Sequence, residues 1–200
     1  MTAILKVDTI QDTAGNNIIN ESSDTITIGA SGDTIALAGT TVTGITQGIT
    51  EADQFRLTAS IVGTNADITS NLERVDDATF SKIGTGMSES SGVFTFPTTG
   101  IYELSCNVMI STTNDSNAQI EVQVSSNSGG AYDIVNNINA GNNNSSSINV
   151  SVSGKTFVDV TNASTFRVKF ATTSFGGSSY VTGDTSSNYT YFSFIRLGAT

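Results

Sequence analysis

The chain has 200 residues, a formal net charge of −10 and only 13% charged residues. Eight basic residues against 18 acidic ones argue against nucleic acid or anionic lipid as a partner, because both are bound through clusters of Lys and Arg. No run approaches the roughly 18 apolar residues of a membrane span, so no membrane insertion is expected. Thr suits strands while Ser, Asn and the 19 Gly suit turns, so the composition indicates an all-β protein.

Residues 1–50 contain short apolar repeats and form a region of their own. The segments DTITIG and DTIALAG, which begin at Asp24 and Asp33, are near-copies of each other. Each copy places two apolar side chains on one face: Ile26 and Ile28 in the first, Ile35 and Leu37 in the second. Short repeats of this kind are typical of a quasi-linear stack.

An isolated copy of this region cannot build a core of its own. Burial of one Ile or Leu contributes about 1.5–3 kcal/mol, whereas ordering each residue costs about 1–2 kcal/mol of backbone entropy. The sequence therefore predicts an N-terminal trimeric β stalk of intertwined short strands, with the four residues of the repeats at the subunit interface. A loosely packed arm is the alternative. Lys6–Ile10 is interpreted as a further strand that caps the stalk or attaches it to another protein.

Residues 51–60 are interpreted as a transition, and residues 61–200 as a globular head. Several segments of the head alternate apolar and polar residues, which is typical of half-buried strands. Strands are expected, among other places, at these segments: Thr79–Ile83, Ala118–Ser125, Tyr132–Asn136, Ser147–Val152, Phe157–Val160 and Thr165–Thr172. About ten short strands separated by turn signals predict an antiparallel sandwich.

The stretch Ser91–Ile110 is the one around which the head is predicted to fold. Residues 97–100, Pro-Thr-Thr-Gly, supply a turn between two strands, because Pro fixes φ and Gly accepts φ > 0. After the turn, alternate residues line one apolar face: Tyr102, Leu104, Cys106, Val108 and Ile110. Cys106 is the one cysteine of the chain, so it is expected to be a buried small hydrophobe without a disulfide.

The closing strand Tyr189–Leu197 is apolar on both faces. Phe192 and Phe194 lie on one face, which can meet the core of its own sandwich. The opposite face carries three further apolar residues: Tyr189, Tyr191 and Ile195. A strand that is apolar on both faces is covered on both faces, so these three residues are predicted to contact a neighbouring subunit.

Two polar segments are interpreted as loops. Asn136–Ser147 is predicted to be a mobile, solvated loop, and its amides at Asn142, Asn143 and Asn144 are candidates to bind glycan hydroxyls. Ala171–Asn188 carries two aromatic rings, Phe175 and Tyr180, which are the best candidates for receptor contact because rings on polar loops can stack on sugars or peptides. The alternatives are a passive Asn-rich loop and rings that tuck over the rim of the sandwich.

The residue types exclude most enzyme classes. Without His there is no Ser-His-Asp or Cys-His arrangement and no His-based metal site, so no enzymatic activity is expected. A carboxylate-based glycoside hydrolase is disfavoured because Asp76 and Asp77 are adjacent and on a strand would point to opposite faces. No cofactor is expected. The alternative is a Ca²⁺ ion bound by carboxylates in or near the loops of the head, which are otherwise interpreted as solvated surface charges: Asp115, Asp133, Asp159 and Asp184.

Residues 71–110 resemble the complement component 1q/tumour necrosis factor jelly-roll superfamily. The family pattern G-V-F-x-x-P-x-x-G-x-Y-x-x-S is matched at seven positions: Gly92, Val93, Phe94, Pro97, Gly100, Tyr102 and Ser105. The closing YFSFIRL resembles the aromatic final strand of the family, so the resemblance covers roughly residues 55–197. It implies a ten-stranded antiparallel jelly roll that assembles into a tight trimer, often on a stalk.

The N-terminal region has no collagen repeat and departs from the animal members of that superfamily. Its opening KVDTIQDTAG and its Thr/Ile repeats resemble tail-fibre or head-fibre proteins of marine bacteriophages. This resemblance implies an external virion appendage, joined to other virion proteins through its N-terminal region, whose head recognises a glycan or protein of the host surface during adsorption. The alternatives are a capsid-decorating or head-fibre structural trimer that binds no receptor, and a depolymerase.

Overall fold

The computed structural model describes residues 9–11, 13–14, 17–22, 25–28, 32, 34, 48–176 and 178–200. The chain divides into two compact units, Met1–Thr46 and Gln47–Thr200, of which the second is called the head below. The described residues of both units form strands and turns, and none of them belongs to a helix long and apolar enough to cross a membrane. The all-β class predicted from the composition is confirmed.

The first unit contains a three-stranded antiparallel sheet. Its strands, in the order β1-β2-β3, are Thr9–Gln11, Asn17–Ser22 and Thr25–Ile28. Ile10 pairs with Ile19, and Ile19 with Ile28, so one row of isoleucine positions crosses the sheet. Ile26 lies on β3, while Ile35 and Leu37 lie outside the described residues.

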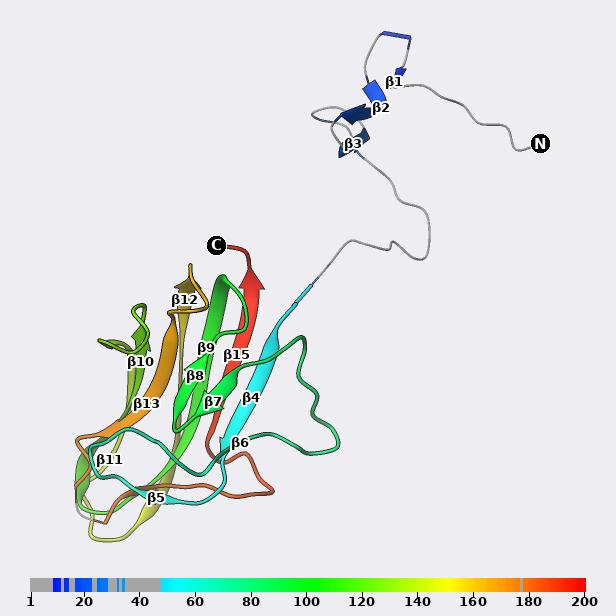
Figure 1. The fold of residues 1–200 in the computed structure, drawn as a ribbon. Coiled ribbons are helices and arrows are strands. Elements are labelled where there is room, and N and C mark those ends of the chain that lie inside the picture. The colour runs from blue at the N-terminus through cyan, green and yellow to red at the C-terminus, as the bar shows by residue number, and fades with distance from the viewer. Residues whose placement is uncertain are drawn as a thin grey trace. The chain divides into compact units, whose positions relative to one another are not determined.

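The larger sheet of the head has seven strands, and Figure 1 shows the strands at residues 52–57, 191–198, 100–112 and 148–160 running side by side. Its strands are β4 (Ala52–Leu57), β5 (Ile61–Val62), β6 (Leu72–Arg74), β9 (Gly100–Thr112), β12 (Ile148–Val160), β14 (Tyr180–Val181) and β15 (Tyr191–Gly198). The long strand β9 is central, because β12 pairs along one edge of it while β14 and β15 pair in succession along the other. All pairings are antiparallel.

The smaller sheet of the head has five strands in the order β11-β10-β13-β8-β7. They are β7 (Ser88–Ser90), β8 (Val93–Thr95), β10 (Asp115–Ser125), β11 (Asp133–Asn142) and β13 (Arg167–Thr173). The two sheets approach each other where β11 meets β12. There Asn136 Nδ2 donates a 3.1 Å hydrogen bond to Lys155 O, and a Cβ at Gly154 would lie 2.5 Å from Ile138 Cγ2, so Gly permits the close approach.

Aromatic rings from both sheets fill the space between them. Phe94 of β8 is fully buried, and its ring centroid lies 5.0 Å from that of Phe55, 5.1 Å from that of Phe194 and 5.8 Å from that of Phe170. Phe170 in turn stacks on Phe192 at 3.8 Å. Phe192 and Phe194, which were predicted to face the core, are therefore confirmed as core residues, and the structure adds Phe94 to them.

The predicted turn at residues 97–100 joins β8 to β9, and Gly100 has φ 146°. A Cβ at Gly100 would lie 2.5 Å from Gly198 O on β15, so this position requires glycine. Next to the turn, the Tyr102 hydroxyl donates to Thr98 O at 3.1 Å. The five residues predicted to line the inner face of β9 are all buried, Cys106 among them, and its thiol is free.

Three expectations about the head are corrected by the structure. Residues 79–83 form no strand, and only Ile83 bridges to Ala52. The loop expected at Asn136–Ser147 is largely strand, since β11 extends to Asn142. The inner side chains of β11 pack toward β12, which stabilises this extension. Residues 51–60 contain β4, which pairs with β15 and β6, so the head begins earlier than residue 61.

Replacing Phe94 by Ala should lower the free energy of unfolding by about 3–5 kcal/mol, because the cavity would lie between both sheets. Ile134, an exposed apolar residue of β11, provides the matched control, and Ile134→Ala should change stability by less than about 0.5 kcal/mol. Urea unfolding of both variants measures the difference. Equal effects of the two substitutions would contradict the placement of Phe94 in the core.

Candidate functional site

The outer face of the seven-stranded sheet carries a shallow depression of about 470 Å³. Its floor is made of small side chains of β9 and β12, Ser105 and Ser153 among them, and Tyr191 of β15 stands at its side. At the rim, Lys155 Nζ lies 3.3 Å from Glu103 Oε2. The depression therefore combines an aromatic ring, hydroxyls and one solvated ion pair on a flat sheet.

A large apolar side chain stands on the same face. Phe157 of β12 pairs with Glu103 of β9, and 64% of its surface is exposed. Phe157 begins a strand that was predicted from the sequence, but no role was predicted for it. Its outward direction follows from alternation, because Val158 and Val160 point into the core.

Cys106 lies below the depression and takes no part in its chemistry. Burial raises the pKa of its thiol to about 11, although the backbone hydrogen bond with Gly154 opposes that shift. The thiol is therefore protonated at neutral pH and unreactive, because the nucleophile is the thiolate.

The residues predicted to contact a neighbouring subunit lie on this outer face or at its margin. Tyr191 and Ile195 are half-buried, while Tyr189 is exposed and its carbonyl accepts a hydrogen bond from Asn107 Nδ2 at 3.2 Å. Their opposite neighbours Phe192 and Phe194 are buried in the core, which confirms the predicted alternation of this strand. The subunit contact itself stays a prediction.

Tyr180 lies on this face as well. It pairs with Ser111 of β9 on one side and with Val62 of β5 on the other, whereas Tyr191 pairs with Asn107 of β9. Odd-numbered residues of β9 point outward, so Tyr180 shares the sheet face of Tyr191 and is 37% exposed. Tyr180 is therefore part of a strand and not of a mobile loop.

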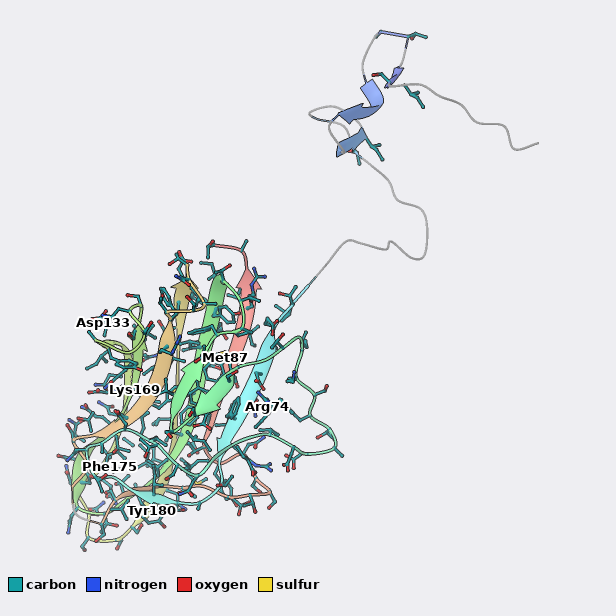
Figure 2. All side chains as sticks on the ribbon, viewed as in Figure 1. Arg74, Met87, Asp133, Lys169, Phe175 and Tyr180 are labelled. Carbon is teal, nitrogen blue, oxygen red and sulfur yellow. The ribbon has the colours of Figure 1, made fainter. Side chains whose placement is uncertain are left out.

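Two predicted receptor contacts are corrected because their side chains are buried. Phe175 is only 8% exposed, its backbone N–H donates to Asn65 Oδ1 at 3.0 Å, and it tucks over the rim near Tyr180 (Figure 2). Asn142 is 5% exposed and donates from Nδ2 to Thr112 O at 2.9 Å and Ser146 O at 2.8 Å. Both residues thus stabilise the head instead of offering surface to a receptor.

The neighbouring amides Asn143 and Asn144 are exposed, as expected for receptor-contact candidates. The backbone of Asn144 is nevertheless held in place. Its N–H donates to Asn142 Oδ1 at 2.9 Å, and its carbonyl accepts from the N–H of Asn114 at 2.9 Å.

Arg56 is the most unusual charge of the head. It pairs with Tyr191 on the outer sheet face, yet it is only 1% exposed because Glu73, Asp76 and Asp77 cover it. Arg56 Nε donates to Glu73 Oε1 at 2.7 Å and Nη1 to Asp77 Oδ2 at 2.9 Å, while Nη2 donates to Asp76. Burial lowers the pKa of Arg56, but the hydrogen bond to Glu73 and the three negative charges outweigh it and raise that pKa overall.

These contacts also correct the expectation that Asp76 and Asp77 point to opposite faces. The two residues follow β6 in a non-strand segment, so both carboxylates can turn toward the same guanidinium. The sequence alone offered no signal for this arrangement, because Arg56 and its partners are more than 15 residues apart.

The loop carboxylates considered for Ca²⁺ lie in different environments. Asp115 is buried and accepts from the N–H groups of Asn117 and Gly176, while Asp133 and Asp159 are exposed. Hydrogen bonds from the backbone N–H and hydroxyl of Ser186 lower the pKa of Asp184. Within the described ranges, no three His, Cys, Asp or Glu residues are grouped in a way that could hold a metal ion.

Similarity to known proteins is found in the fold of the head and not in the sequence of the chain. No family model matches the chain, and no curated protein matches it. Among solved structures, Eiger TNF from S. frugiperda matches with a TM-score of 0.54 at 8% identity, over 74% of this chain and 93% of that one. Murine APRIL matches with a TM-score of 0.53 at 10% identity, over 74% of this chain and 98% of that one. The head therefore has the tumour necrosis factor-type jelly-roll fold, as the sequence resemblance implied.

Replacing Arg56 by Ala should lower the free energy of unfolding by about 1–3 kcal/mol, because three partly exposed carboxylates would lose their shared cation and the buried space of the Arg56 side chain would be left unfilled. Urea unfolding measures this loss. The matched control is Lys155→Ala, which removes an exposed ion pair and should cost less than about 1 kcal/mol. If Arg56→Ala lowers the free energy of unfolding by no more than the control does, the ion pairs of Arg56 do not stabilise the head as proposed.

Proposed function

We propose that the chain is a homotrimeric bacteriophage fibre protein whose jelly-roll head binds a glycan or protein of the host surface without chemical reaction. The binding part of the proposal is supported by the tumour necrosis factor-type fold of the head. It is also supported by the outer sheet face, where apolar side chains stay exposed in a single subunit. The first unit would join the head to other virion proteins.

The support for a trimer comes from the outer face of the seven-stranded sheet. Phe157 belongs to β12, which among the described residues pairs with β9 alone, so it stands near an edge of the sheet. The depression beside Tyr191 belongs to the same face. A side chain near the edge of one copy that fills the depression of the next is a head-to-tail contact, and three such contacts close into a ring.

The first unit supports the same assembly. Ile10 and Ile28 are exposed at the two sides of the isoleucine row of the three-stranded sheet. Matching rows from three copies would cover each other, as predicted for the repeats of the sequence. Ile26 and Ile28 of β3 would form part of that stalk interface. Ile35 and Leu37 of the second repeat would continue the interface further along the chain.

The virion context depends on the resemblance of the N-terminal segment to marine phage fibres. The location on an external tail or head fibre is proposed on that ground. The competing proposal, from a different functional class, is a structural capsid-decorating or head-fibre trimer that binds no receptor, and adsorption experiments separate the two.

Phe157→Asp should convert the trimer into monomers, because it places a charge in the proposed contact; Tyr191→Ala should weaken assembly in the same direction. Sedimentation velocity at nanomolar concentration measures the oligomeric state. The matched control is Ile134→Asp, an exposed apolar residue of the five-stranded sheet, which should leave the trimer intact. A monomeric wild-type protein, or trimeric Phe157→Asp, would contradict the interface.

The labelled full-length protein should bind saturably to some strains in a panel of marine bacteria. Phe157→Asp should bind at least about tenfold more weakly, because a monomer loses the multivalent attachment of three heads. Flow cytometry measures both. Lack of binding to every strain would favour the capsid-decorating alternative, whereas release of reducing sugar from host polysaccharide would favour a depolymerase.

A further inference from the structure

The outer face of the five-stranded sheet carries an array of amide side chains on β10 and β11, called the amide face below. Gln119 pairs with Asn139 and Glu121 with Asn137, so these side chains point to the same side of the sheet. Asn117 and Gln123 continue the row on β10. The residues between them on β10, Ala118, Ile120 and Val122, are buried in the core.

Hydrogen bonds between the side chains hold the amide face in a fixed orientation. Asn137 Nδ2 donates to Gln119 Oε1 at 3.2 Å, and Gln119 Nε2 donates to Asn117 Oδ1 at 2.9 Å. Asn139 Nδ2 lies 3.4 Å from Asn117 Oδ1, and Gln123 Nε2 donates to Glu121 Oε2 at 2.6 Å. Each amide keeps further donor or acceptor sites that face solvent.

The fold gives no reason for amides at these positions. Four of the ten residues of β11 are Asn, a residue that is depleted in strands. Asn136 and Asn142 bind backbone carbonyls of neighbouring segments, whereas the side-chain hydrogen bonds of Asn137 and Asn139 within the described part of the chain go to other side chains of the amide face. Positions where local preference and observed structure disagree often serve a function.

The chemistry of the amide face suits a neutral carbohydrate. Within the array only Glu121 carries a charge, and amide groups both donate to and accept from hydroxyls. Tyr132 comes directly before β11, and Lys169 Nζ, at the β13 position that pairs with Gln123, lies 4.2 Å from the Tyr132 ring centroid. An aromatic ring next to orienting polar groups is a common combination in ligand sites.

We propose that the amide face binds a neutral polysaccharide chain of the host surface, which names the receptor class of the proposed function and rests on it. The net charge of −10 disfavours acidic polysaccharides as the occupant. The amide face lies on the sheet opposite to Phe157 and Tyr191, so trimer formation through those residues leaves it accessible.

The test uses the full-length protein and immobilised dextran, agarose and laminarin as neutral probes, with alginate as an acidic probe. The double variant Asn137→Thr with Asn139→Thr removes two amides but places a strand-favouring residue at each site, so its melting temperature should stay equal or rise. Its binding to at least one neutral probe should be about tenfold weaker than that of the wild type. Binding of the wild type should change little between low and high salt, as expected for an uncharged ligand.

The matched control is Asn149→Thr, the same substitution at an exposed amide on β12 of the seven-stranded sheet, outside the amide face, which should leave binding unchanged. The inference is overturned if the wild type binds none of the neutral probes, if the double variant binds as well as the wild type, or if the control loses as much binding. Wild-type protein that adsorbs to bacteria while the double variant adsorbs equally would overturn the inference alone. Polysaccharide binding without adsorption to any strain would overturn the proposed function alone.

Discussion

The packing of Phe94 against Phe55, Phe170 and Phe194 is the contact on which the head depends, because it joins the two sheets at their centre. The rings fill this space in one arrangement of edge-to-face and tilted contacts. This arrangement fixes which face of each strand points into the core. Because successive side chains of a strand point to opposite faces, the residues that face outward then follow from those that face the core. The aromatic core therefore also decides which side chains can serve function.

The two outer faces that result differ in chemistry. The seven-stranded sheet exposes Phe157, Tyr180 and a depression beside Tyr191, which suits contact between subunits. The five-stranded sheet exposes hydrogen-bonded amides, which suit a solvated, hydroxyl-rich ligand. Under the proposed assembly and binding, the two faces would serve different partners, so both contacts could form at once.

Sequence patterns predicted the features that depend on neighbours along the chain. The alternation around Phe192 and Phe194 and the turn that ends at Gly100 were predictable because period and turn chemistry are local. The strand at Asn136–Asn142 was not, since its stability comes from the pairing with β10 and the contact with β12, which outweigh the preferences of Asn. The carboxylates around Arg56 were hidden for the same reason, because their partner lies on a distant strand.

The interruption between β14 and β15 has a practical consequence. Leu57 of β4 accepts a backbone hydrogen bond from the N–H of Asp184 and donates one to the carbonyl of Thr190, so the segment between them leaves the sheet and returns to the same place. Because closing a longer loop between fixed ends adds little entropic cost, foreign peptides could be inserted after Ser186 with the sheet kept intact. This segment is thus a natural position for an epitope tag or a display library on the protein surface.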